Sequence, residues 1–212
     1  CSSTSTRAQS IVSLTEGNIS RQLDESVLTG GSITALLGFQ NKDLQDAKNL
    51  LGQLAAAIGT RVNTQNALGL DLSNPPGQGA RIFNVADPSV LPAATNQRDP
   101  AGNFISGVQV AITDASLLQA SSYKLTSSVA GSYTLTRLSD GKTQAVNPGD
   151  TVDGFSINFA PAAPAPGESF LIEPVGAAAL NMRRVLDDPN GIAAASPLTA
   201  ATSINNTGTL TI

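Results

Sequence analysis

Histidine and tryptophan are absent from this 212-residue chain, and cysteine and methionine each occur once. Without histidine, the serine–histidine–aspartate and cysteine–histidine arrangements of hydrolases cannot form. A single cysteine, Cys1, excludes a disulfide within the chain and zinc sites of the usual cysteine and histidine kind. Composition alone therefore removes the commonest nucleophilic and metal-dependent chemistries.

Charge and long apolar runs are also scarce. Charged residues make up 13% of the chain, aromatic residues 4%, and the formal net charge is −4. Because the chain has no basic footprint, we expect no nucleic-acid partner. No apolar run approaches 18 residues, so we expect no membrane span. The weakly charged, polar exterior is typical of a protein that self-associates or is exported.

The first residues leave two interpretations open. The only methionine is Met182, so we expect a processed product or an excised piece. The opening CSSTSTR resembles a mature bacterial lipoprotein, in which a lipidated Cys1 precedes a polar tether. An arbitrary boundary or a leftover tag is the simpler explanation of the same residues.

The strongest pattern lies between Gly30 and Val62. Apolar residues recur three or four positions apart, which is the spacing of one helix face. They are Ile33, Leu36, Leu37, Leu44, Ala47, Leu50, Leu51, Leu54, Ala55, Ile58 and Val62, whereas Asn49 and Gln53 fall on the polar side. We predict a long amphipathic helix over residues 32–69, with its apolar face packed within this chain.

The helix has recognisable end signals and two internal glycines. Ser32 has the residue type of an N-cap, and Gly69 that of a helix stop. Gly52 and Gly59 each cost about 1 kcal/mol inside a helix. Together with the alanines between them they predict a smooth strip for close packing, and a kink at Gly59 is the alternative.

Turns and alternating residues dominate the rest of the chain. We predict a strand and turns over residues 1–31, and a proline- and glycine-rich loop over residues 70–107. Residues 108–196 predict an antiparallel β-domain of about six strands, a sandwich or open barrel, with a short helix over residues 177–186. Asp140-Gly141 has the composition of a type I′ hairpin turn. The fold class is therefore α+β, and residues 197–212 look like the start of a further, truncated segment.

Several short motifs contain reactive residue types without the context that catalysis needs. Ser121-Ser122-Tyr123-Lys124 has the spacing of a lysine-activated serine, but a strand would point the two side chains to opposite faces. Gly141-Lys142-Thr143 and Gly77-Gln78-Gly79 lack the further glycines of phosphate and dinucleotide sites. The carboxylate pairs Asp24-Glu25 and Asp187-Asp188 fit solvated turns. We predict no enzyme, no cofactor, and no catalytic, cofactor-binding or metal-binding residues.

A longer set of residues carries a family resemblance. The helix contains Leu51 to Ala55, LGQLA, and is followed by Asn63, Gly69 and Asp71. Further matching pieces are residues 110–114, 120–124, 133–137, 153–155, 166–174 and 192–195. In this order and spacing, most of residues 11–196 resembles the FlgK-type family of flagellar hook-associated protein 1.

The resemblance implies a structural protein of the bacterial flagellum. Such a protein is exported through the flagellar channel and works outside the cell, in a ring at the hook–filament junction. The implied partners are other copies of itself, the hook protein and the second junction protein. This chain lacks the family's terminal heptad helices, so it looks like the middle portion, and we expect it to be monomeric and catalytically silent by itself.

Two other functions stay open at this point. A surface lipoprotein or adhesin-like β-domain fits Cys1 and the polar surface. A hydrolase with an acidic site would need two carboxylates that converge in one pocket.

Overall fold

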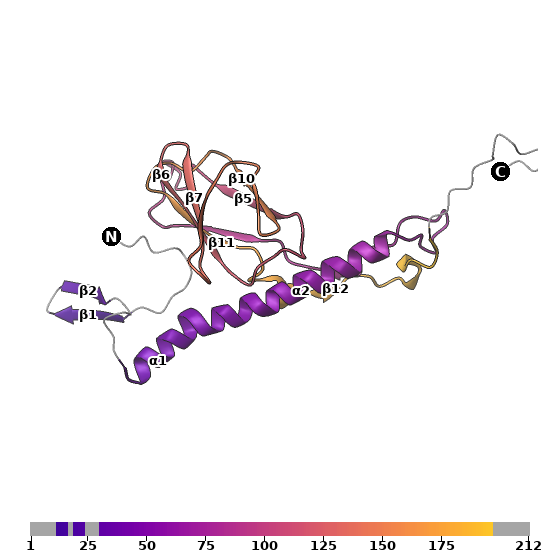
Figure 1. Cartoon of the computed structure of the whole chain (residues 1–212), viewed down its shortest axis with the longest axis horizontal. Helices are drawn as coiled ribbons and strands as arrows, with labels where there is room; N and C mark the ends of the chain where they lie inside the picture. The colour runs from indigo at the N-terminus through magenta and orange to yellow at the C-terminus, as the bar shows by residue number, and fades with distance from the viewer. Residues whose placement is uncertain (1–11, 17–18, 24–29, 197–212) are drawn as a thin grey trace, which may run out of the picture. The chain divides into compact units, whose positions relative to one another are not determined.

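The computed structural model describes residues 12–16, 19–23 and 30–196 of the chain. It separates into two compact units. The first unit is Cys1–Ile58 with Val85–Met182, and the second unit is Gly59–Asn84 with Arg183–Ile212. A long helix and antiparallel strands occur together, which confirms the predicted α+β class (Figure 1).

The helix runs without a break from Ser32 to Ala67 and supplies residues to both units. It consists of α1 (Ser32–Gly38), a π-helical turn η2 (Phe39–Asp43) and α2 (Leu44–Ala67). The N-cap is Gly31, and no side chain caps the helix. The prediction of Ser32 as N-cap is therefore wrong by one residue, because the chain enters the helix through two positive-φ glycines, Gly30 and Gly31.

Gly69 also has a different role from the one predicted. The helix ends at Ala67, and Gly69 does not take the left-handed conformation of a helix stop. A Cβ at Gly69 would lie only 2.6 Å from the Cβ of Ala193 and 2.9 Å from the carbonyl oxygen of Ala195. Glycine is required there because another segment of the second unit passes so closely.

Strands β1 (Val12–Glu16) and β2 (Ile19–Leu23) form an antiparallel pair near the start of the chain. The sequence predicted one strand followed by turns in this stretch, so the second strand was missed. Asp24-Glu25, Cys1 and residues 197–212 lie outside the described residues.

The β-domain of the first unit is a sandwich of two antiparallel sheets. The strands are β4 (Ser89–Pro92), β5 (Val108–Ile112), β6 (Tyr123–Val129), β7 (Ser132–Arg137), β8 (Thr143–Val146), β9 (Thr151–Val152), β10 (Phe155–Phe159) and β11 (Ser169–Glu173). One sheet has the order β4-β11-β6-β7-β8 and the other β5-β10-β9. Edge-to-face ring contacts join them, Tyr123 to Phe155 at 4.9 Å and Tyr133 to Phe159 at 4.5 Å.

Two predictions about strands and turns need correction. Strand β4 lies within the stretch predicted as a loop, where Pro88 and Pro92 weaken the strand signal. It tolerates proline because it is the edge of its sheet. The two-residue turn with positive φ at both positions is Asp153-Gly154, between β9 and β10, whereas five residues around Asp140-Gly141 connect β7 to β8.

The short helix predicted over residues 177–186 is only partly present, and a two-residue strand follows it. Only α3 (Ala178–Asn181) is helical, and β12 (Arg183–Arg184) follows it. Strand β12 pairs with β3 (Phe83–Asn84), so a tertiary contact with a distant segment decides its conformation over local preference.

Two asparagines of α2 hold the second unit together. The side chain of Asn63 accepts from the amides of Ile82 and Phe83, both at 2.9 Å, and donates to the Phe83 carbonyl at 2.7 Å. Asn66 donates to the carbonyls of Ala80 and Gly191 and accepts from the amide of Ala193. An asparagine satisfies donors and acceptors of irregular backbone at once, which an apolar residue cannot do.

The first unit has a helix contact made of small residues. Ala55 and Ala56 are buried, and a Cβ at Gly52 would lie 1.9 Å from the carbonyl oxygen of Val175. Nearby, Asn49 donates to the Ser122 hydroxyl at 3.3 Å, and Gln53 donates to the Leu118 carbonyl at 2.5 Å. The predicted smooth strip is present, and helix and β-domain meet with their backbones close together.

Two glycines of the helix provide a matched test of this contact. Gly52→Ala should destabilise the chain by about 1–3 kcal/mol, because the new methyl group collides with the Val175 carbonyl. Gly38→Ala should stabilise it by up to about 1 kcal/mol, since a Cβ there meets no atom within 4 Å and alanine favours the helix. Chemical denaturation measures both. Destabilisation of equal size in the two variants would contradict the close contact at Gly52.

Candidate interaction surface

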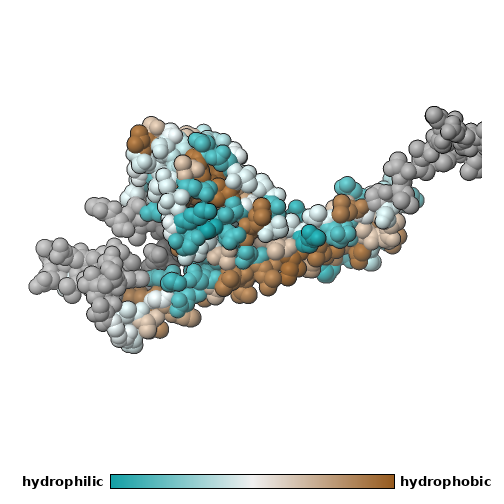
Figure 2. All heavy atoms as spheres, in the orientation of Figure 1, coloured by the Kyte–Doolittle hydropathy of each residue, from teal (hydrophilic) through white to brown (hydrophobic). Residues whose placement is uncertain are grey.

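A row of large apolar side chains lies exposed along the helix. Its members are Ile33, Leu36, Phe39, Leu44, Leu50, Leu51, Leu54 and Ile58, with exposed fractions between 39% and 67%. We call these eight residues the leucine row. Figure 2 shows a hydrophobic band along the helix.

The prediction that the apolar face from Ile33 to Val62 packs within this chain is wrong. The face in contact with the β-domain contains Asn49, Gly52 and Gln53 together with two alanines, and the polar residues among them were predicted to face outward. The physical reason is that the β-domain presents backbone carbonyls and a serine hydroxyl to the helix. Small residues and side-chain amides fit such a surface, whereas leucines would neither fit nor satisfy its acceptors.

Part of the leucine row has the spacing of a coiled-coil seam. Leu44, Leu51 and Ile58 are seven residues apart, and Leu54 lies between the last two, as Ala47 lies between the first two. Alternating steps of three and four residues keep one narrow stripe in line along a helix. Each half-exposed leucine that becomes buried contributes roughly 1 kcal/mol or more. A stripe of this kind is a candidate surface for another helix.

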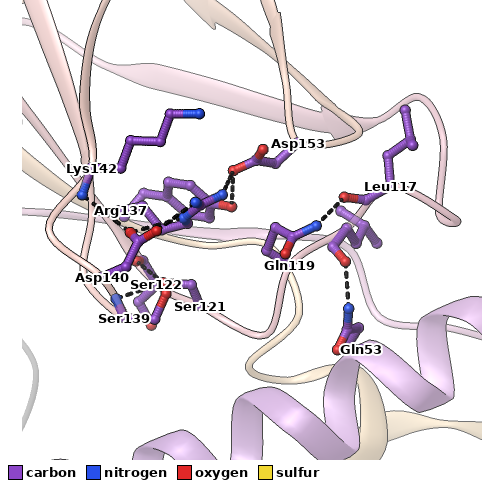
Figure 3. A network of polar contacts seen from close by, with 12 residues as sticks. Gln53, Leu117, Gln119, Ser121, Ser122, Arg137, Ser139, Asp140, Lys142 and Asp153 are labelled. Carbon is purple, nitrogen blue, oxygen red and sulfur yellow. Dashed lines mark hydrogen bonds and ion pairs between the residues drawn. The ribbon is translucent and has the colours of Figure 1, made fainter.

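A polar cluster fixes the shape of the β-domain beside the helix contact (Figure 3). Arg137, at the end of β7, donates to both carboxylate oxygens of Asp140, at 3.0 and 2.6 Å, and to Asp153 at 2.9 Å. The Tyr123 hydroxyl also donates to Asp153, at 2.6 Å. Asp153 belongs to the β9–β10 turn, so Arg137 and Tyr123 of one sheet are tied to a turn of the other.

The protonation behaviour of this cluster follows from its contacts. The guanidinium of Arg137, together with the Lys142 amide, holds the pKa of Asp140 well below its usual range. Burial, and then the hydrogen bond to Asp153, raise the pKa of the Tyr123 hydroxyl far above its ordinary value. The arrangement therefore keeps the Asp140 carboxylate ionised and the Tyr123 phenol neutral, which suits a structural role. We call Tyr123, Arg137, Asp140 and Asp153 the clasp.

The motifs with reactive residue types have structural contacts in place of catalytic ones. Ser121 is buried, donates to the Ser122 carbonyl and accepts from the Ser139 amide. Gly77 donates its amide to Asp71 at 2.7 Å, which closes the turn containing Gly77-Gln78-Gly79. Gly141-Lys142-Thr143 lies between β7 and the start of β8, where the Lys142 amide donates to Asp140.

The remaining carboxylate pair is also accounted for by structural contacts. Asp187 forms an ion pair with Arg184 at 2.9 Å, and Asp188 accepts from the Asn190 amide at the start of a short 3₁₀ turn, η3 (Pro189–Gly191). Within residues 12–16, 19–23 and 30–196, no three histidine, cysteine, aspartate or glutamate side chains come together as a metal site would require.

The most useful residues that sequence reasoning missed are Asn49, Gln53 and Asn66. Each uses its side-chain amide to bind backbone or a hydroxyl in its own unit. A weak signal was available, because asparagine is a poor helix former and three asparagines occur between residues 49 and 67 of the helix. Some of their hydrogen-bond partners lie between 65 and 127 positions away in the sequence. No local pattern can show such pairings.

An exposed apolar stripe on a helix docked to a β-sandwich fits a structural protein that works by contact with other helices. In addition, no helix of the described residues is both long enough and apolar enough for a membrane span. The sequence pattern described as flagellar hook-associated protein FlgK helical domain matches residues 2–83. The pattern described as flagellar hook-associated protein 1, D2-like domain, matches residues 96–174.

Individual relatives agree with these patterns. The chain is 34% identical over 198 residues to flagellar hook-associated protein 1 of Escherichia coli K12, and 30% identical over 190 residues to the protein of the same name from Salmonella typhimurium LT2. These matches cover 92% and 85% of this chain, but 34% and 31% of the relatives. The flagellar hook junction protein FlgK from Burkholderia pseudomallei has a similar solved structure, with a TM-score of 0.73 and 29% identity over 92% of this chain and 35% of that one.

The chain belongs to the FlgK-type family of flagellar hook-associated proteins, as its sequence predicted. It spans about a third of the length of the relatives it matches. The matches favour a flagellar protein over the surface lipoprotein or adhesin that Cys1 left open.

Acid should weaken the clasp around Arg137. Because the folded-state pKa of Asp140 is depressed, its contribution to stability is present above the unfolded-state pKa and is lost as the pH falls below about 4. Asp140→Asn should therefore be less stable than the parent chain at neutral pH, and the difference should shrink in acid. Thermal unfolding between neutral and acidic pH measures this.

A second arginine–aspartate pair with the same three-residue spacing provides the control. Arg184 and Asp187 have side chains that are 62% and 86% exposed, against 18% and 47% for Arg137 and Asp140. Asp187→Asn should change stability little at any pH, as exposed ion pairs generally do. If both variants behave alike, the clasp has no special role.

Proposed function

We propose that this chain is a structural part of the junction between hook and filament in a bacterial flagellum, without catalysis of its own. The leucine row carries the proposal, because a helix whose large apolar side chains are exposed is built to be covered in an assembly. Membership of the hook-associated family supports it, as does the solved relative described as a hook junction protein.

In this proposal, successive stretches of the chain have different structural roles. Residues 32–67 form the spine, and residues 85–182 form a β-domain set against its small-residue face. Residues 1–31 precede the spine in the sequence, and residues 70–84 link it along the chain to the β-domain. Docking by Gly52, Ala55 and Ala56 leaves the leucine row free for other contacts.

We assign the leucine row to a further helix of the same helical domain. The family pattern over residues 2–83 describes a helical domain, yet its described residues contain only the single helical stretch from Ser32 to Ala67. One helix cannot bury its own stripe, so a domain of this description needs at least a second helix. The seven-residue spacing of Leu44, Leu51 and Ile58 fits a partner helix whose axis runs nearly parallel or antiparallel to this one.

The wider partners are those of a junction component. In this proposal, the complete protein is exported through the flagellar channel and assembles outside the cell as a ring of identical copies. The ring contacts the hook protein on one side and the second junction protein on the other. By itself the 212-residue chain should stay monomeric, because ring closure needs two complementary surfaces between subunits and the leucine row is assigned to a helix of the same subunit. A stable ring in sedimentation velocity would contradict this.

The leucine row can be tested with a closely matched control. Leu51→Gln combined with Leu54→Gln should change the stability of this chain by less than about 0.5 kcal/mol for each site, because both side chains already face solvent. In the complete protein the same pair should reduce attachment of filaments to hooks and swimming. Electron microscopy of isolated hooks and motility assays measure these effects.

Leu117→Gln serves as the control for exposure. Leu117 lies in the β-domain and is 56% exposed, as is Leu54. The control should leave filament attachment unchanged. Normal attachment in the double variant, or an equal loss in the control, would refute the assignment of the row.

A further inference from the structure

The second unit contains a chemically labile dipeptide, Asn190-Gly191, in the short turn η3. We propose that Asn190 is a site of spontaneous deamidation whose reaction is blocked while the second unit is folded. The proposal concerns chemical modification and does not rest on the function proposed above. Four observations carry it.

The chemistry needs only this dipeptide and water. The backbone nitrogen of Gly191 loses its proton and attacks the side-chain carbonyl carbon of Asn190, and the amide nitrogen leaves as ammonia. Water then opens the resulting five-membered imide. Opening at one carbonyl gives aspartate, and opening at the other gives isoaspartate, in which the main chain runs through the former side chain.

The first observation is that the fold requires glycine at this position. Gly191 is buried, and an added Cβ would lie 2.7 Å from a methyl group of Leu186 and 3.0 Å from the Cβ of Ala80. Glycine after asparagine leaves the attacking backbone nitrogen unhindered, so deamidation is fastest when glycine follows. The packing of the second unit therefore requires at position 191 the residue that makes Asn190 most reactive.

The second observation is that the side chain is accessible. Asn190 is exposed, and none of the described hydrogen bonds engages its side-chain amide. Solvent water can therefore reach the reacting carbonyl carbon, and side-chain burial does not provide the protection.

The third observation is that the nucleophile is engaged. The Gly191 amide donates to the Asp188 carbonyl at 3.1 Å, and the Asn190 amide donates to the Asp188 side chain at 2.9 Å. These bonds hold the turn in its 3₁₀ form. The attack needs the Gly191 nitrogen to give up its hydrogen bond and turn toward the Asn190 side chain.

The fourth observation is that the peptide group cannot turn. The Leu72 amide donates to the Asn190 carbonyl at 2.9 Å, while the Gly191 carbonyl accepts from the Ala80 amide at 2.8 Å and from the Asn66 side chain at 3.1 Å. Both carbonyls that flank the reacting nitrogen are fixed by segments far away in sequence. Only opening of the second unit would release them.

The modification would also leave a lasting mark. In isoaspartate, the Asn190 carbonyl that accepts from the Leu72 amide becomes part of a free carboxylate, and the main chain reaches Gly191 through the former side chain with one more methylene. The bonds of Leu72 and Asn66 could therefore not both reform in their present register. The new carboxylate would lie beside Asp187 and Asp188, where like charges repel. A chain modified while open should therefore close less well.

Peptide mass mapping of the whole 212-residue chain tests the proposal. The chain is held in mildly alkaline buffer with and without denaturant, and conversion of Asn190 is compared with that of Asn84, which precedes valine. We expect Asn190 to be the fastest site in denaturant and to react about tenfold or more slowly in the folded chain. A folded rate within about twofold of the unfolded rate would overturn the proposal.

A variant adds a second, independent readout. Asn66→Ala removes one bond to Gly191 and should raise the rate at Asn190 in the folded chain. Lys42→Ala breaks only an exposed ion pair in the first unit and should leave that rate unchanged. If Asn66→Ala does not fold, a temperature series of the parent chain replaces it. The rate at Asn190 should then rise together with hydrogen exchange at the Ala80 and Gly191 amides, and a rate that does not follow this exchange would refute the mechanism.

Discussion

The close approach of the helix to the β-domain at Gly52 is the constraint on which the described architecture of the first unit depends. The Val175 carbonyl lies where a side chain at position 52 would begin, and Ala55 and Ala56 continue the same flat surface. Contact at this distance excludes large side chains from the docked face. The leucines are therefore left on the other side, so the internal packing of the unit creates its external surface.

Polar contacts also fix the helix against the β-domain. Asn49 and Gln53 satisfy a hydroxyl and a carbonyl of the β-domain, while Arg137, Tyr123 and Asp153 hold its two sheets together near the same place. In the second unit, the side chains of Asn63 and Asn66 likewise form hydrogen bonds with backbone groups of neighbouring segments. Such networks fix one geometry, because each unmade bond would leave a buried polar group without a partner. A structural protein benefits from that precision, since its neighbours in an assembly must match it.

Much of the fold was predictable from local patterns. The helix, most of the strands between β5 and β11 and the family followed from spacing and order in the sequence, whereas β8 and β9 lie beside stretches interpreted as turns. The failures have specific physical causes. Strand β4 was hidden by prolines that an edge tolerates, β12 formed because β3 was available to pair with it, and the type I′ turn lies at Asp153-Gly154 because the flanking strands meet there.

The sequence by itself determined that the helix has an apolar stripe, that common histidine- and cysteine-based sites are impossible, and that the chain resembles hook-associated proteins. These conclusions depend on composition and periodicity, which are local properties. Tertiary structure alone decided which side of the helix the β-domain covers. Periodicity shows that two faces differ, but the partner surface selects between them, and here it offers carbonyls at a distance that only glycine, alanine and side-chain amides can meet.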